Sequence, residues 1–245
     1  MIDFSKAYIS QAIYLVSNKP DPKVRFKQES AEEAFSAFLS AQSQQTNLPD
    51  DFDPSQPRLI FQNPPKQLII SQIACQLSLG FEPAQKPLSD QLNIVINNIR
   101  EVHKKIVKFK GIENLRENAA IISLSIPSKA SREDLSGYLF DRFVKLPKYA
   151  EVASTSVKAG YLLQSNNFLN IDTDVYEKRG GMIAAGQTID MMSLPIVEEG
   201  ITIKVDLNSR PKLNLPGYQN EGPEELITLI NEYIPSQVQQ LLNAS

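Results

Sequence analysis

The chain has 245 residues, of which 42% are hydrophobic and 22% charged, and this balance excludes intrinsic disorder as the first interpretation. Its single cysteine, Cys75, excludes an intramolecular disulfide, and its single histidine, His103, excludes most acid–base and zinc sites. The net charge of −3 divides into +2 over residues 1–110 and −5 over residues 111–245, so we do not expect a nucleic-acid-binding surface.

The chain carries no segment that predicts export or membrane insertion. Its start, MIDFSKAYIS, lacks the basic segment and apolar stretch of a secretory signal. No apolar run approaches the roughly 20 residues that a membrane helix needs. We therefore expect a cytoplasmic protein with no membrane partner.

The first half of the chain predicts a strand, a helix, three strands and a second helix. Residues 6–16 are rich in Tyr, Ile and Val, as strands are. Ser30, with Glu33 three residues later, predicts that a helix begins there with a capping box. After a connector rich in proline and aspartate (46–57), a hairpin and a third alternating strand are expected over residues 58–79.

The clearest helix is predicted at residues 88–109, where apolar residues follow the 3.6-residue period. The second half repeats the order of the first. A strand is expected at residues 119–126, and Ser131 with Asp134 predicts the next helix start. The remaining elements are strands at about 151–164, 168–177 and 200–208, and a helix that begins at Gly222 and is kinked at Pro235.

These elements predict an α+β fold built from two similar halves, residues 1–110 and 111–245. Each half reads strand–helix–three strands–helix, and the segments SAEEAFSAFL (30–39) and SREDLSGYLF (131–140) align with each other. We expect antiparallel sheets with helices packed on one face, and halves that share an interface in one compact unit.

The same pattern resembles a sporadically distributed family of uncharacterised bacterial proteins of about this length. The matching segments are RLIFQNPPKQLII, the helix after it, FLNIDTDVY (168–176), and GITIKVDLN followed by a C-terminal helix. The resemblance implies no known activity, cofactor or catalytic residue. The patchy distribution of that family suggests a role in defence or in mobile elements.

One candidate metal site is the pair Asp172 and Asp174. Alternate side chains of a strand leave the same face about 7 Å apart, a spacing similar to the aspartate pair that holds a divalent metal in many nucleotide-sugar glycosyltransferases. The other interpretation is that both face solvent and pair with Lys204 on a neighbouring strand. No nucleotide-binding region precedes the pair, which favours the second interpretation.

Two further segments are candidate contact surfaces. Residues 181–188 have the spacing of a phosphate-binding loop, but Gln187 replaces its lysine, so we interpret residues 178–199 as a loop between strands. That loop carries Met182, Met191 and Met192, which are adaptable contact residues if a partner binds. The other candidate is a lysine cluster near a helix end, Lys104, Lys105 and Lys108, with His103 beside it complementing the helix dipole.

These observations predict a protein that binds another protein, such as an immunity, antitoxin or regulatory component, without a catalytic site or cofactor. A homodimer is a further possibility. The alternative is a metal-dependent nucleotide or nucleotide-sugar enzyme centred on Asp172 and Asp174. A third option is a nucleic-acid-associated factor that uses the lysine cluster, and its binding would be sensitive to salt. A magnesium-dependent nuclease of the Asp…Asp/Glu-x-Lys type needs the final tripeptide of this motif on a strand. The example in this chain, Asp21-Pro22-Lys23, falls in a proline-broken loop and does not predict a nuclease site.

Overall fold

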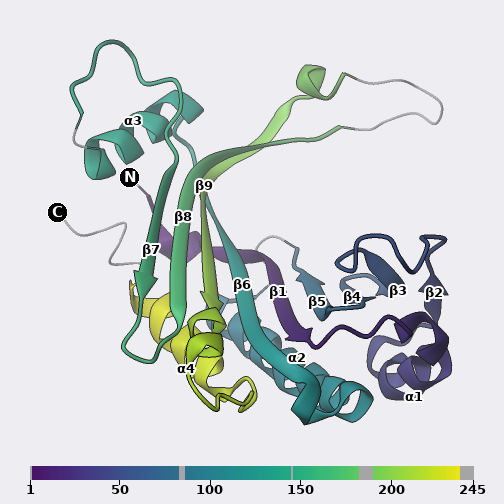
Figure 1. Ribbon diagram of the computed structural model, residues 1–245. Helices are drawn as coiled ribbons and strands as arrows, with labels where there is room; N and C mark the ends of the chain where they lie inside the picture. Colours follow the sequence, from purple (N-terminus) through teal and green to yellow (C-terminus); the bar gives the residue numbers. More distant parts are fainter. Residues whose placement is uncertain (1, 83–85, 145, 182–189, 238–245) are drawn as a thin grey trace.

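The computed structural model describes residues 2–82, 86–144, 146–181 and 190–237. Within these ranges the chain forms an α+β fold with one nine-stranded antiparallel sheet and four α-helices (Figure 1). The strands are β1 (Tyr8–Asn18), β2 (Ser43–Gln45), β3 (Pro57–Asn63), β4 (Lys66–Ser71), β5 (Ala74–Gly80), β6 (Leu115–Ser128), β7 (Val157–Leu162), β8 (Phe168–Arg179) and β9 (Ile196–Asn208). The helices are α1 (Gln28–Leu39), α2 (Leu88–Lys110), α3 (Arg132–Phe143) and α4 (Glu224–Glu232).

The strands lie in the order β2-β3-β4-β5-β1-β6-β9-β8-β7. Strand β1 pairs with β5 on one side and with β6 on the other, so the sheet runs continuously across both predicted halves. The expectation of several antiparallel sheets was therefore wrong, because the first strands of the two halves pair with each other. The first half also has a strand more than predicted, since the three residues of β2 pair with β3.

The helices cover one face of this sheet. Helix α1 packs on β3 and β4, α2 crosses β1 and β5, and α4 lies on β6 and β9. Helix α3 contacts β8 and β9, and the backbone N–H of Arg132 at its start donates to Glu199, which alternates onto the same face as Ile201 and Ile203. The predicted apolar stripe of α2 is confirmed: Leu92, Val95, Ile96, Ile99, Val102 and Ile106 are all buried.

The two predicted capping boxes had different outcomes. Helix α3 begins as predicted, because the Asp134 N–H donates to the Ser131 hydroxyl at 3.2 Å. Helix α1 begins earlier than predicted, at Gln28, as the continuation of a 3₁₀ turn over Val24–Lys27. Ser30 therefore lies inside the helix, and the predicted capping box at Ser30 was wrong.

The α-helical hydrogen bonding of α4 ends at Glu232 and gives way to a π-helical turn, Tyr233–Gln237, which contains Pro235. Pro235 explains this change of helix type, since proline has no amide hydrogen to donate to the helical hydrogen-bond pattern. No helix in the described ranges is both long enough and apolar enough to cross a membrane.

The connector over residues 46–57 is held down by one buried side chain, Arg58 at the start of β3. The guanidinium group of Arg58 donates to the carbonyl oxygens of Gln56 and Phe52, both at 2.9 Å, and to that of Asp53 at 3.3 Å. Its side chain is fully buried. This residue therefore replaces the sheet hydrogen bonds that an irregular segment lacks.

Candidate functional site

The face of the sheet opposite the helices is covered by no helix in the described part of the chain. We call it the open face. Alternation along β8 puts Asn170, Asp172, Asp174 and Tyr176 on it, and alternation along β9 adds Thr202, Lys204, Asp206 and Asn208. The sequence predicted these two sets, and the pairing of β8 with β9 confirms that they lie side by side.

Asp172 lies between two lysines. In the sheet register it is opposite Lys204 on β9 and opposite Lys158 on β7. Side chains directly opposite each other have Cβ atoms about 4.5–5.5 Å apart, close enough for charge compensation. Asp174, by contrast, faces Thr202, and its Oδ1 accepts from the neighbouring Val175 N–H at 2.7 Å. The register therefore favours cross-strand charge pairing at Asp172.

A metal site at Asp172 and Asp174 stays a prediction. Across the described ranges, no group of three or more His, Cys, Asp or Glu side chains is placed to hold a metal ion. Lysines that can compensate the charge of Asp172 lie opposite it in the register of both neighbouring strands. A thermal shift with Mn²⁺ or Mg²⁺ and a nucleotide, lost in Asp172→Ala, would support the enzyme alternative.

The centre of the open face is aliphatic. Ile13 and Leu15 of β1 lie there, and Ile13 is opposite Ile121 of β6. Ile60 of β3 and Ile69 of β4, which are opposite each other, form a second aliphatic group, separated from the first by Gln76 of β5. All five side chains are half-buried, so each still presents apolar surface to solvent.

Amide and hydroxyl side chains lie between and around these two aliphatic groups. Gln76 of β5 is opposite both Leu15 and Ile69, and Gln67 of β4 is opposite Ser78. Such side chains both donate and accept hydrogen bonds. The open face thus combines an apolar centre with neutral hydrogen-bonding groups, and its charged residues lie mainly towards β7, β8 and β9.

A polar cluster that the sequence did not predict joins β1 to the extended ends of β8 and β9. The hydroxyl groups of Tyr8 and Tyr176 donate to Glu198 Oε1 at 2.9 and 2.8 Å, and Lys178 Nζ lies 2.7 Å from the same oxygen. Although burial opposes charge on both groups, their mutual hydrogen bond raises the pKa of Lys178 and lowers the pKa of Glu198. Because the two groups neutralise each other, we interpret the cluster as a structural joint.

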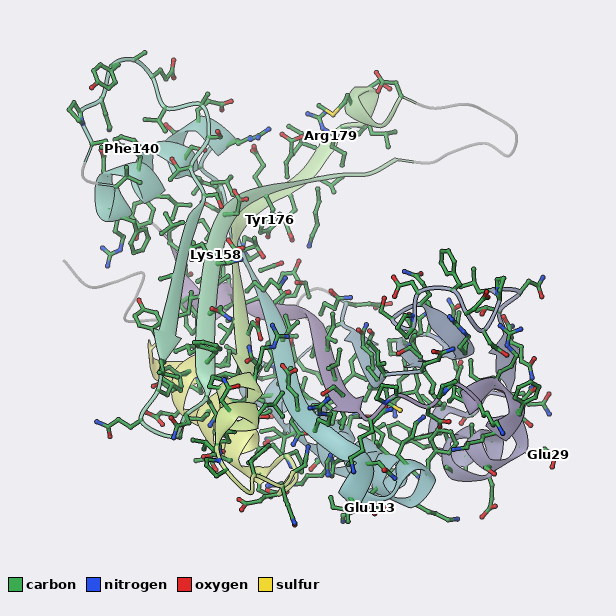
Figure 2. All side chains as sticks on the ribbon, in the orientation of Figure 1. Glu29, Glu113, Phe140, Lys158, Tyr176 and Arg179 are labelled. Carbon is green, nitrogen blue, oxygen red and sulfur yellow. The ribbon has the colours of Figure 1, made fainter. Side chains whose placement is uncertain are left out.

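Beyond this cluster β8 and β9 extend past the other strands as a two-stranded arm, on the side of the sheet away from α1, α2 and α4 (Figure 1). Tyr176 marks its base and Arg179 lies further out (Figure 2). The predicted loop at residues 178–199 is shorter than expected, because β8 continues to Arg179 and β9 begins at Ile196.

Of the predicted contact residues in this segment, Met182 and Gln187 lie outside the described residues. Met191 begins a 3₁₀ turn, and Met192 in that turn is 68% exposed. Arg179 donates to the carbonyl oxygens of Met192 and Leu194, which fixes the turn against β8. A partner-binding role for the methionines stays a prediction.

The predicted lysine cluster does not form one surface. Lys108 pairs with Glu33 of α1 at 2.7 Å, whereas Lys105 lies 3.9 Å from Glu101 and over the ring of Phe38. Lys104 lies instead on the α4 side, where the hydrogen bond from Arg100 lowers the pKa of Glu224 and the charge of Lys104 adds to this effect. The charges therefore point in different directions, and all three are on α2, away from the open face.

His103 does not complement the helix dipole as expected, because its side chain is buried between α2 and Tyr14 of β1. Its Nδ1 shares a hydrogen bond of 2.7 Å with the Tyr14 hydroxyl, and that hydroxyl donates to Asn118 Oδ1 at 3.2 Å. Burial lowers the pKa of His103, partly opposed by the Glu224 carboxylate. Burial likewise raises the pKa of the Cys75 thiol to about 11, so Cys75 is not an activated nucleophile.

The lowered pKa of His103 predicts a pH dependence of stability. An unfolded histidine takes up a proton near pH 6.5, whereas the folded one does so only at lower pH. Its contribution is therefore complete above about pH 6.5 and falls as the pH drops towards the folded pKa. We expect the free energy of unfolding to decline between pH 7 and 5.5, and His103→Asn to decline less. Urea titrations across this range measure the difference, and equal slopes would contradict the assignment.

Comparisons of the chain with protein-family models, with curated proteins and with solved structures found no match.

Proposed function

We propose that this chain is a non-enzymatic binding protein that holds a protein partner on its open face. One observation carries the proposal: the helices cover one face of the sheet, and the described residues place no element over the aliphatic centre of the other. Exposed apolar patches rimmed by polar residues are typical of protein-interaction sites. An immunity, antitoxin or regulatory role fits such a surface.

The charges on the open face favour a protein over a nucleic acid. Asp172, Asp174 and Asp206 outnumber the two exposed lysines, Lys158 and Lys204, and the strands on the other side of the centre present mainly glutamine and serine. A nucleic-acid backbone requires a surplus of Lys and Arg. A partner with an apolar centre and neutral to mildly basic surroundings would complement this face.

We also infer that the open face is built from two related halves. In each half a central strand, β1 or β6, is followed by a helix, by strands that return towards the centre, and by a closing helix. The similar segments at residues 30–39 and 131–140 fall on α1 and α3, the first helices of the two halves. A duplication of this kind would explain why β1 and β6 are neighbours.

The test is a pull-down with matched double variants. Gln67→Arg with Gln76→Arg places two charges beside the aliphatic centre, whereas Asn93→Arg with Asn97→Arg places the same charges on the exposed side of α2. We expect wild type and the α2 variant to recover one specific protein from the host, and recovery by the open-face variant to fall about tenfold or more, because unpaired charges would be buried.

Two results would contradict the proposal: equal recovery by the open-face variant, or no specific protein recovered by wild type. A second copy of this chain is the rival occupant. Light scattering on the purified protein distinguishes it, because a dimer that is lost in the open-face variant would replace the heterologous partner.

A further inference from the structure

A second surface, on the helix side of the molecule, has the composition of an anion-binding site. A cavity of about 400 Å³ lies where the end of β1 and the loop after it meet the end of α2. Its lining includes four lysines, Lys19, Lys23, Lys27 and Lys110, and one carboxylate, Asp21. This volume is within the range of small-molecule sites. The local surplus of positive charge contrasts with the net charge of −3 for the chain.

Asp21 organises two of the lysines. Its Oδ2 lies 2.9 Å from Lys27 Nζ and 3.1 Å from Lys110 Nζ. The Lys110 side chain is only 3% exposed, so one ammonium group is held at the inner wall of the cavity. Although burial opposes it, pairing with the two lysines lowers the pKa of Asp21, which keeps this carboxylate ionised at neutral pH.

The other two lysines have no carboxylate partner in the described chain. Lys19 and Lys23 are exposed and come from the loop after β1, so the dipole of α2 does not account for them. The end of α2 also does not need these lysines as hydrogen-bond donors, because the carbonyl group of Lys110 already accepts from Asn114 Nδ2 at 2.7 Å. Two ammonium groups therefore remain available to an anion.

Asn18 also lines the cavity, and its side chain is buried in the wall. Asn18 is 4% exposed, and its Nδ2 donates to the carbonyl oxygens of Lys19 and Gln72. Those two bonds fix the orientation of the amide, and Oδ1 accepts no hydrogen bond from the described residues. Because this oxygen has almost no solvent-accessible surface, it lies behind the cavity wall, and Asn18 serves to hold the backbone of the lining loop in place.

We propose that this cavity binds the phosphate group of a small phosphorylated molecule. Lys19 and Lys23 bind the phosphate from the solvent side, with Lys27 and Lys110 behind them. Phosphate is the group that a set of lysines with several donors binds best. The site is independent of the open face, since it uses the loop after β1 and the end of α2.

Isothermal titration with glycerol 3-phosphate, inorganic phosphate and glycerol tests this site. We expect both glycerol 3-phosphate and inorganic phosphate to bind, and glycerol alone not to bind. Lys19→Gln with Lys23→Gln should weaken glycerol 3-phosphate binding about tenfold or more, because two charge-assisted contacts are lost. The matched control, Lys104→Gln with Lys129→Gln, removes the same charge from exposed positions elsewhere and should bind as wild type does.

Three results would overturn the proposal. The first is no heat of binding with either phosphate compound. The second is equal weakening in the control variant, which would reduce the effect to net charge. The third is tighter binding of a short single-stranded RNA than of glycerol 3-phosphate, which would indicate an extended polyanion. Circular dichroism of each variant verifies that the fold is retained.

Discussion

Replacing Arg58 with methionine is expected to lower the free energy of unfolding by about 3 kcal/mol. Methionine fills much of the same volume but donates no hydrogen bond, so the carbonyl groups of Phe52, Asp53 and Gln56 lose their shared partner. Hydrogen bonds to a charged donor contribute about 1.5–3 kcal/mol each, and their carbonyl acceptors, which belong to exposed residues, regain part of this from water. Because small domains are stable by only about 5–15 kcal/mol, this loss should be visible as a much lower urea midpoint.

Arg100→Met is the matched control for Arg58→Met. Arg100 binds Glu224 through two nitrogens, but its side chain is 45% exposed. Exposed ion pairs contribute at most about 1 kcal/mol, so this variant should unfold close to wild type. If both variants lose the same small amount, Arg58 does not hold the connector.

Gly200→Ala is expected to destabilise the protein by about 1–3 kcal/mol, as overpacking does. Gly200 lies opposite Tyr176 in the sheet, and a Cβ at this position would be 2.8 Å from both Cε1 and the hydroxyl oxygen of that ring. It would also meet the backbone oxygen of Ile126, which cannot move without disturbing β6. The ring of Tyr176 would have to move away from residue 200, and its hydrogen bond to Glu198 would be lost.

Gly137→Ala should have the opposite sign. Gly137 lies within α3, and a Cβ there would contact nothing within 4 Å. Alanine in a helix interior is more favourable than glycine by about 0.5–1 kcal/mol. Urea unfolding of the two variants should therefore move the midpoint in opposite directions, and a stabilised Gly200→Ala would contradict the close packing of Tyr176.

Local sequence patterns predicted most of the elements because their information lies in neighbouring residues. The 3.6-residue period placed α2 within one residue of its bounds, and Ser131 with Asp134 marked the start of α3. The pattern failed where a tertiary contact decides. Ser43–Gln45 becomes a strand only because β3 lies beside it, and Ser30 lost its capping role because a preceding 3₁₀ turn extends the helix.

The candidate surfaces were less predictable, because they depend on pairs far apart in the chain. Alternation showed which face of β8 and β9 the aspartates occupy, but not that Lys158 would flank Asp172 on the other side. Nothing near Tyr8 in the sequence indicates its contact with Glu198. Likewise Lys110 reaches Asp21 across 89 positions, so the basic cavity emerges only once the sheet has brought β1 beside the end of α2.

The most direct test of the open face is carboxylate labelling with a carbodiimide, in the free chain and in its complex with the captured partner. Asp174 is an exposed carboxylate on the open face, and Glu29 on α1 is an exposed carboxylate remote from it (Figure 2). We predict that complex formation lowers the labelling of Asp174 severalfold and leaves Glu29 unchanged. Protection of Glu29 with unchanged labelling of Asp174 would place the partner on the helices and contradict the account.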